Sequence, residues 1–139
     1  MAVVRGSETL TRIKLPFDPK AFPWPRDWQA ITDGFEGDSA NAMGYMETFG
    51  TDEIPATNFV SELRREMCPE HPLFHRHLLA IACSTVDPDN VLFYTDDRIE
   101  PFAFVHLTWH TERTAAFPYC KTYPTVDAFL KHCSDNCCP

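Results

Sequence analysis

The stretch LLAIACSTVDPDNVLFY, residues 78–94, decides the fold of this chain. It contains two apolar runs, residues 78–86 and 91–94, which are separated by Asp87-Pro88-Asp89-Asn90. Aspartate, asparagine and proline favour tight turns, so this arrangement predicts a β-hairpin. The connection is too short for a crossover, and the two strands must therefore be antiparallel.

The segment FAFVHLTWHTE, residues 102–112, predicts a third strand of the same sheet. Alternation places an apolar set on one side and a mixed set on the other. The apolar side holds Ala103, Val105, Leu107 and Trp109, and the opposite side holds Phe102, Phe104, His106, Thr108 and His110. We expect the apolar side to meet the helices, with Trp109 as a structural residue. The histidine side is then the open face, unless the N-terminal arm covers it.

Two segments have the 3.6-residue spacing of amphipathic helices. The first covers residues 58–67 and stops before Pro69, and the second follows Thr125, a favourable N-cap. Short strands are expected near residues 11–15 and 42–49. The four prolines between residues 16 and 25 predict an extended arm over residues 1–27. Together these features predict one α+β domain over residues 1–139, with an antiparallel sheet of about four strands packed on two helices and a cysteine-rich tail at 134–139.

The composition limits the classes of partner. A net charge of −8 and an isoelectric point of about 5.1 disfavour nucleic acid and anionic membranes, which reward clusters of Lys and Arg. A basic protein is the charge-compatible partner. The start of the sequence shows no signal peptide and no apolar run is long enough to span a bilayer, so we expect a soluble, cytoplasmic protein.

The histidines and cysteines are candidate metal ligands, because zinc is bound by three or four converging side chains of these types. His77, His106 and His110 are the candidate ligands. They can bind one ion only if their side chains lie on one face of neighbouring strands. Against this, His77 shares a strand side with Leu79, Ile81 and Cys83, an apolar set that favours the core. Solvated or capping histidines are the simpler interpretation. The cluster of His132, Cys133, Cys137 and Cys138 lacks a second ligand pair, and no cofactor is expected.

A hydrolase is the alternative functional interpretation. In it, His106 or His110 serves as general base, Thr108 or a cysteine as nucleophile, and Glu62 or Glu66 as the orienting carboxylate. The sequence has no nucleophile elbow and no phosphate-binding glycine loop to support it. The spacing of Glu62, Arg65 and Glu66 predicts an exposed, ion-paired helix face instead.

Three short elements, in order, resemble those of a group of small uncharacterised bacterial proteins. They are His71-Pro72-Leu73, Asn90-Val91-Leu92-Phe93 and Val105-His106-Leu107-Thr108-Trp109. The resemblance spans about residues 57–130 and implies a compact α+β domain, without assigning any catalytic residue.

These observations favour a non-catalytic binding or regulatory domain, of the immunity or antitoxin type, that binds a basic partner. Its expected contact face carries Phe104, His106, Thr108 and His110.

Overall fold

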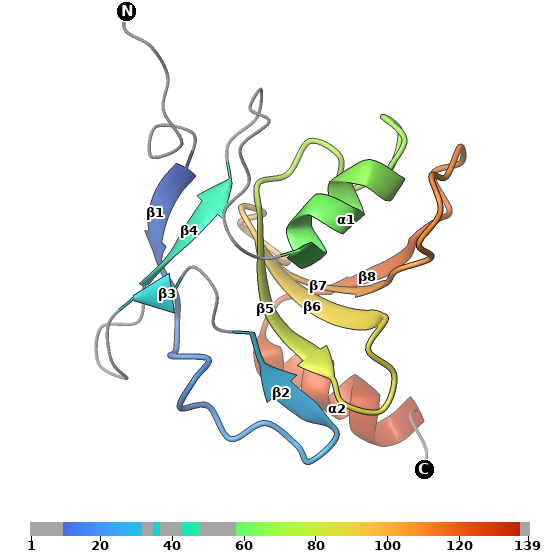
Figure 1. Cartoon of the computed structure of the whole chain (residues 1–139). Helices are drawn as coiled ribbons and strands as arrows, with labels where there is room; N and C mark the ends of the chain where they lie inside the picture. The colour runs from blue at the N-terminus through green and yellow to red at the C-terminus, as the bar shows by residue number, and fades with distance from the viewer. Residues whose placement is uncertain (1–9, 32–34, 37–42, 48–57, 137–139) are drawn as a thin grey trace, which may run out of the picture.

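The structure is a computed structural model that describes residues 10–31, 35–36, 43–47 and 58–136 of the chain. Its strands come in two runs, each followed by one helix, as in an α+β fold (Figure 1). The elements are β1 (Leu10–Lys14), β2 (Trp28–Ala30), β3 (Phe35–Glu36), β4 (Met43–Glu47), α1 (Asn58–Glu66), β5 (Leu78–Ser84), β6 (Asn90–Thr95), β7 (Phe102–His106), β8 (Tyr119–Tyr123) and α2 (Val126–Asn136).

The main sheet has five antiparallel strands in the order β2-β5-β6-β7-β8. Its centre is the predicted meander of β5, β6 and β7, with the hairpin turn at Asp87–Asn90, where the backbone amide of Asn90 donates to the carbonyl of Asp87 over 2.9 Å. The sequence predicted about four strands. It missed the two edge strands, β2 and β8, which have three and five residues.

A second, three-stranded sheet of order β1-β4-β3 lies beside the main sheet (Figure 1). Its strands β1 and β4 agree with the short strands expected near residues 11–15 and 42–49. The prediction of an extended arm over residues 1–27 is not confirmed, because the chain after β1 turns, with the backbone N–H groups of Ala21 and Phe22 donating to the carbonyl of Asp18. Residues 1–9 lie outside the described part of the chain.

The two helices pack on opposite faces of the main sheet, so the structure has a layer on each side of it (Figure 1). On one face, Val60 and Leu63 of α1 pack with Val91, Phe93 and Val105. On the other face, Phe129 of α2 packs with a different buried set that comprises Leu79, Ile81, Leu92, Phe102 and Tyr123. The side of β7 that carries Phe102 and Phe104 is therefore not open, because α2 covers it together with the chain before β2, which is the exception stated for the N-terminal arm.

A β-bulge in β5 changes which residues share a face. The pairing of β5 with β6 shifts between Ala80 and Ala82, and the extra residue is Ile81. A bulge reverses the alternation beyond it. As a result Leu79 and Ile81 pack on the α2 side, whereas Cys83 packs on the α1 side. The prediction that Leu79, Ile81 and Cys83 share one side of the strand is therefore wrong for Cys83, because Cys83 lies beyond the bulge.

Local sequence signals explain where α2 begins and where α1 ends. The hydroxyl of Thr125 accepts the backbone N–H of Ala128 over 3.1 Å, which is the N-cap bond predicted for α2. Helix α1 stops at Glu66, three residues before Pro69. Helix α2 continues to Asn136, into the segment predicted to be a tail. In the described part of the chain, no helix is both long and apolar enough to cross a membrane.

Candidate functional site

The residues of the predicted contact face do not all lie on one strand, because β7 ends at His106 rather than continuing to residue 112. Phe104 lies beneath α2, where its ring stacks on that of Phe129 at 6.1 Å between centroids and meets the edge of Trp28 at 6.4 Å. It therefore belongs to the packing between sheet and helix. Thr108 and His110 follow the strand, in a segment where period-two alternation no longer applies.

The two histidines of this segment have different surroundings. His106 is partly buried and its Nδ1 lies 2.6 Å from Oδ1 of Asn90, its cross-strand neighbour. His110 is exposed, and its backbone N–H donates to the hydroxyl of Thr108. The hydrolase interpretation required His106 and His110 on one strand face, and the structure does not place them so.

The third metal candidate, His77, lies far from the other two. His77 precedes Leu78, which pairs with Thr95 at one end of β6, whereas His106 pairs with Asn90 at the other end. The length of β6 therefore separates His77 from His106. With a rise of about 3.3 Å per residue, that separation is about 16 Å. His77 Nδ1 instead lies 2.6 Å from Oδ2 of Asp96. Within the described ranges, no group of three or more His, Cys, Asp or Glu side chains is arranged to hold a metal ion.

His71, the histidine of the HPL element, serves a structural purpose. Its side chain is buried, and its Nδ1 accepts the backbone N–H of Leu73 over 3.0 Å. Its Nε2 therefore carries the proton and donates to the carbonyl of Pro118 over 2.8 Å. Burial lowers the pKa of His71, which keeps the ring neutral. This is the capping alternative considered from the sequence, and it ties the segment after α1 to the start of β8.

The glutamates of α1 form a buried carboxyl pair, where the sequence predicted an exposed ion-paired face. Glu66 is 0% exposed and Glu62 is 9% exposed. Oε1 of Glu66 accepts the backbone N–H and the hydroxyl of Thr108, at 2.9 and 3.1 Å, and Oε2 accepts the backbone N–H of Trp109 at 2.7 Å. Glu62 accepts two bonds from Arg65. The pair thus anchors the chain after β7 to helix α1.

This environment separates the titration of the two carboxyls. Burial, together with the hydrogen bond that the protonated carboxyl donates to Glu62, raises the pKa of Glu66 to about 7, against the opposing effect of the bonds donated by Thr108 and Trp109. Burial also acts to raise the pKa of Glu62, but its hydrogen bonds with Glu66 and Arg65 outweigh burial and lower the pKa overall. One proton is therefore held by the pair, on Glu66, into the neutral range.

Trp109 is not a core residue, which corrects the prediction from alternation. Its side chain is 49% exposed and its indole Nε1 donates to Oδ1 of Asp89 over 2.6 Å. Its φ angle is +61°, in the left-handed region. That conformation costs a non-glycine residue about 1–2 kcal/mol. Alternation fails here because Leu107 is the last residue that packs in the core before the chain turns toward Glu66.

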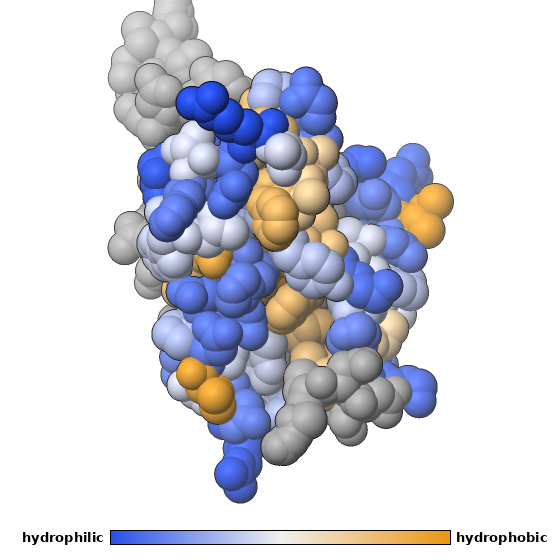
Figure 2. Space-filling view, turned by 90° about the vertical axis from the view of Figure 1, so that its right-hand side faces the viewer, coloured by the Kyte–Doolittle hydropathy of each residue, from blue (hydrophilic) through white to orange (hydrophobic). Residues whose placement is uncertain are grey.

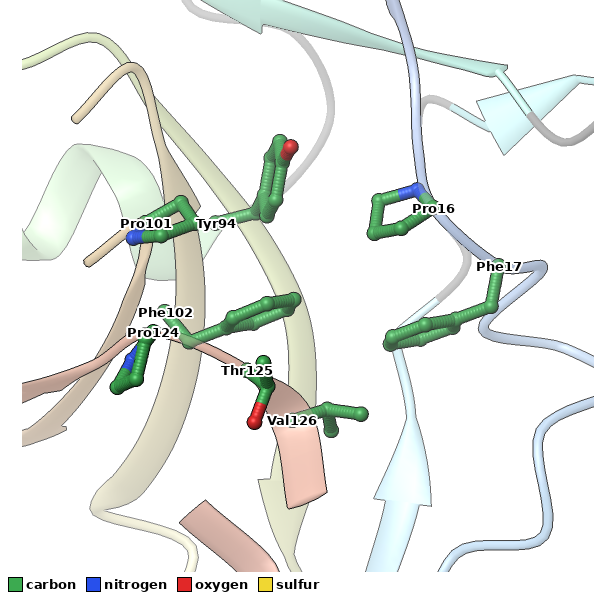
Figure 3. A pocket seen from close by; sticks show the side chains of 8 residues that line it. All are labelled: Pro16, Phe17, Tyr94, Pro101, Phe102, Pro124, Thr125 and Val126. Atoms are coloured by element: carbon green, nitrogen blue, oxygen red, sulfur yellow. The ribbon is translucent and has the colours of Figure 1, made fainter. Parts of the chain in front are cut away.

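A surface pocket that the sequence did not reveal lies at the opposite end of β6 and β7 (Figure 3). Its volume is about 290 Å³, and its walls come from the segment before β2, the ends of the central strands and the start of α2. The lining residues are Pro16, Phe17, Tyr94, Pro101, Phe102, Pro124, Thr125 and Val126. In Figure 3 the rings of Phe17 and Phe102 approach from opposite walls, and they are nearly parallel at 6.1 Å between centroids.

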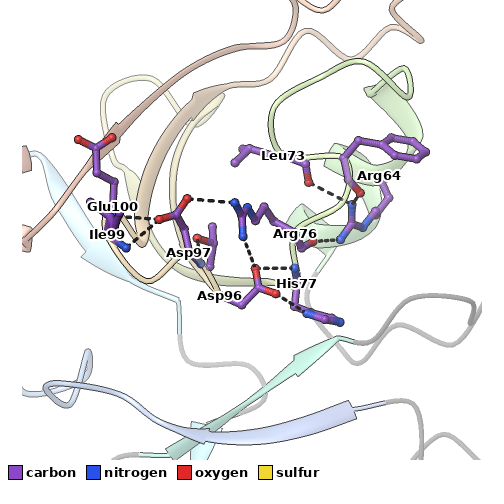
Figure 4. Close-up of polar contacts among 10 residues, drawn as sticks. Arg64, Leu73, Arg76, His77, Asp96, Asp97, Ile99 and Glu100 are labelled. Atoms are coloured by element: carbon purple, nitrogen blue, oxygen red, sulfur yellow. Dashed lines mark hydrogen bonds and ion pairs between the residues drawn. The ribbon is translucent and has the colours of Figure 1, made fainter.

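An acidic loop follows β6, one to two residues from the lining residues Tyr94 and Pro101 (Figure 4). Asp97 Oδ1 accepts the backbone N–H groups of Ile99 and Glu100 at 2.8 and 2.9 Å, which fixes the turn and lowers the pKa of Asp97. Arg76 pairs with Asp96 at 3.7 Å and with Asp97 at 3.3 Å.

Arg64 of α1 holds the segment that leads to Arg76 (Figure 4). Its guanidinium donates to the carbonyls of Leu73 and Phe74, at 3.4 and 2.6 Å, and to that of Arg76. In the structure Arg64 bonds backbone carbonyls and Arg65 bonds Glu62, so both are used to hold the fold.

These features were compared with known proteins. No family model, no curated protein and no solved structure matches the chain.

Proposed function

We propose that this chain is a binding domain, of the immunity or antitoxin type, that recognises a basic protein and receives one of its apolar side chains in the pocket of Figure 3. The observation that carries the proposal is the chemistry of the pocket. Six of its eight lining residues are proline, phenylalanine or valine, and the other two, Tyr94 and Thr125, contribute hydroxyl groups. Binding to such a surface is favoured by about 25 cal/mol for each Å² of apolar surface that is removed from water.

The hydroxyls of the pocket leave this preference unchanged. The hydroxyl of Thr125 already accepts the N-cap bond of α2. Burial raises the pKa of Tyr94 above its ordinary value, so its phenol is neutral at physiological pH. A neutral, largely apolar pocket gains most from an apolar or aromatic side chain, which typically contributes about 1.5–3 kcal/mol when fully buried.

The charge of the chain favours a basic partner. The net charge is −8, and acidic residues adjoin the pocket in the sequence: Glu100 precedes Pro101 and Asp127 follows Val126. Charges of this kind act over a screening length of about 8 Å at physiological ionic strength and accelerate the encounter with an opposite charge. Positive side chains beside an apolar anchor therefore complement this surface.

The shape of the molecule offers further apolar contact. On the side where the chain turns between β7 and β8, hydrophobic residues form a band between hydrophilic margins (Figure 2). Within this turn, residues 107–118, the large hydrophobic side chains that are exposed are Trp109 and Phe117. Exposed aromatic residues are enriched in protein interfaces, where they supply much of the binding energy.

The test is affinity capture from the native host with three versions of the full chain as bait. Val126 is the first residue of α2, where an aspartate is favoured by the helix dipole, so Val126→Asp places a charge in the pocket at a tolerated position. Val86→Asp is the matched control, because Val86 is 72% exposed and does not line the pocket.

We expect a basic protein that wild type and Val86→Asp capture equally and that Val126→Asp loses. Circular dichroism and a thermal melt establish that each bait is folded. If Val126→Asp unfolds, Pro124→Arg takes its place, because Pro124 is exposed and also lines the pocket. Capture that is indifferent to the pocket variants, or that yields only acidic proteins, would refute the proposal.

A further inference from the structure

The fold does not explain why position 109 is a tryptophan. Its backbone N–H donates to Oε2 of Glu66 and its indole N–H donates to Oδ1 of Asp89, at 2.7 and 2.6 Å. These two bonds fix the orientation of the ring. The ring itself is 49% exposed, so it contributes little to the core.

The backbone conformation makes the choice of tryptophan more unusual. At a φ of +61° a glycine would make the same backbone bond to Glu66 without the steric penalty of a Cβ atom. A large side chain at such an angle is uncommon, and strained residues persist mainly at binding sites and switches. The strain is not offset by burial of the ring. We infer that the ring is held at the surface for recognition.

The surroundings of the ring indicate what it recognises. The face of an indole attracts cations, and an arginine guanidinium also stacks on it as a plane. Asp89, which accepts the indole N–H, places a carboxylate at the edge of the same ring. Asp87 accepts the backbone N–H of Asp89 and adds a second carboxylate to this turn. A guanidinium over the ring can therefore stack and donate to a carboxylate at once.

We propose that Trp109 and Asp89 form a recognition site for an arginine side chain of a protein partner. Arg65, a cation of the chain itself, is already bonded to Glu62, and its guanidinium lies 3.5 Å from the hydroxyl of Thr111. The site lies apart from the pocket. Asn90 pairs with His106 at one end of β6 and β7, and Tyr94 pairs with Phe102 at the other.

The separation between these ends is four residues, or about 13 Å at the usual rise of a strand. The arginine site thus extends the proposed function to a second surface and does not require the pocket. Its test can use a peptide in place of the partner. A blocked hexa-arginine peptide is titrated at 150 mM salt into the 15N-labelled full chain, and the indole N–H signals are followed by NMR.

The chain has three tryptophans and therefore three indole signals. The signal lost in Trp109→Leu identifies Trp109. We expect this signal to shift and saturate, while that of Trp24, whose indole N–H donates to the carbonyl of Pro19, stays in place. A blocked hexa-lysine peptide carries the same charge without the planar group, and we expect it to bind more weakly.

Two substitutions that preserve the net charge provide the decisive comparison. Trp109→Leu should weaken binding of the arginine peptide by about twofold to fivefold, the size typical of an exposed cation–π contact. Tyr119→Leu is the matched control, because Tyr119 is an aromatic residue with a similar exposure of 48%, and it should leave the affinity unchanged. Asp89→Asn keeps an acceptor for the indole but removes the charge, and should weaken binding as well.

Equal affinity of wild type and Trp109→Leu, equal losses in Trp109→Leu and Tyr119→Leu, or an unshifted Trp109 signal would each overturn the arginine site. The backbone spectrum shows in the same experiment whether a variant is folded. Val126→Asp should bind the peptide like wild type, so a failure of the pocket proposal and a failure of this one are told apart.

Discussion

Replacing Glu66 by glutamine should reverse the order of stability between variant and wild type as the pH rises. In the folded chain the pKa of Glu66 is about 7, against 4.5 for an ordinary glutamate. Between these values the folded chain keeps a proton that the unfolded chain releases. Because the folded-state pKa is raised, the associated stability is fully present below pH 4.5 and is lost as the pH rises through 7.

The magnitude follows from the shift. Each pKa unit corresponds to 1.36 kcal/mol, so deprotonation of Glu66 should remove about 3 kcal/mol from the free energy of unfolding of the wild type. Glutamine cannot ionise and removes this slope. It also has one oxygen in place of two, so an amide nitrogen facing Glu62 leaves the backbone N–H of Trp109 without its acceptor. A lost hydrogen bond of this kind typically costs about 1 kcal/mol.

We therefore expect Glu66→Gln to be about 1 kcal/mol less stable than wild type at pH 4 and about 2 kcal/mol more stable at pH 8. The lowered pKa of Glu62 affects stability only on the acid side, because that contribution is lost as the pH falls. Urea unfolding at both pH values, followed by circular dichroism, measures the difference. Glu70→Gln, at an exposed site beyond the helix, is the control and should follow wild type. Parallel stability curves for wild type and Glu66→Gln between pH 4 and 8 would refute the reasoning.

Further predictions concern the contribution of single side chains to stability, and chemical unfolding at pH 5 measures each of them. Leu107→Ala should lose about 2–5 kcal/mol, because Leu107 is 1% exposed. Trp109→Ala should lose no more than about 1 kcal/mol, from its indole bond; a loss as large as that of Leu107→Ala would mean that the ring is buried. Arg64→Lys should lose about 1–3 kcal/mol, because one ammonium group cannot donate to all the carbonyls that the guanidinium bonds. Arg65 has a half-exposed side chain, so Arg65→Lys should change stability by less than about 1 kcal/mol. Equal losses in the two variants would contradict this prediction. Thr125→Ala should lose about 1 kcal/mol through its N-cap bond, and an unchanged unfolding midpoint would show that the cap contributes nothing.

Features that depend on neighbouring residues could be predicted from the sequence. The hairpin between β5 and β6 follows from the Asp87–Asn90 turn, and its brevity requires antiparallel strands. The helix after Thr125 follows from a cap and an apolar spacing that lie within a few residues of each other. Likewise Val105 and Leu107 were correctly assigned to the core, because alternation holds within the strand and for one residue beyond it.

Features that depend on distant partners were decided by the tertiary structure. The alternation pattern shows which residues share a side, but both sides of the central strands carry apolar residues, and only the path of the chain places α1 on one and α2 on the other. Exposed and partly buried residues alternate along the edge strand β8, which is paired with β7. The five residues of β8 do not by themselves specify this pairing.

The candidate site shows the same division most clearly. On a helix of nine residues, Glu66 looks like one member of an exposed charged face. It is buried because Thr108 and Trp109, more than forty residues later, bring three donors to its carboxyl group. Burying a carboxyl is unfavourable unless its oxygens are hydrogen-bonded. Spacing along a helix cannot reveal donors that reach it from another part of the chain, and so the burial of Glu66 and the exposure of Trp109 were settled together by the tertiary contact between them.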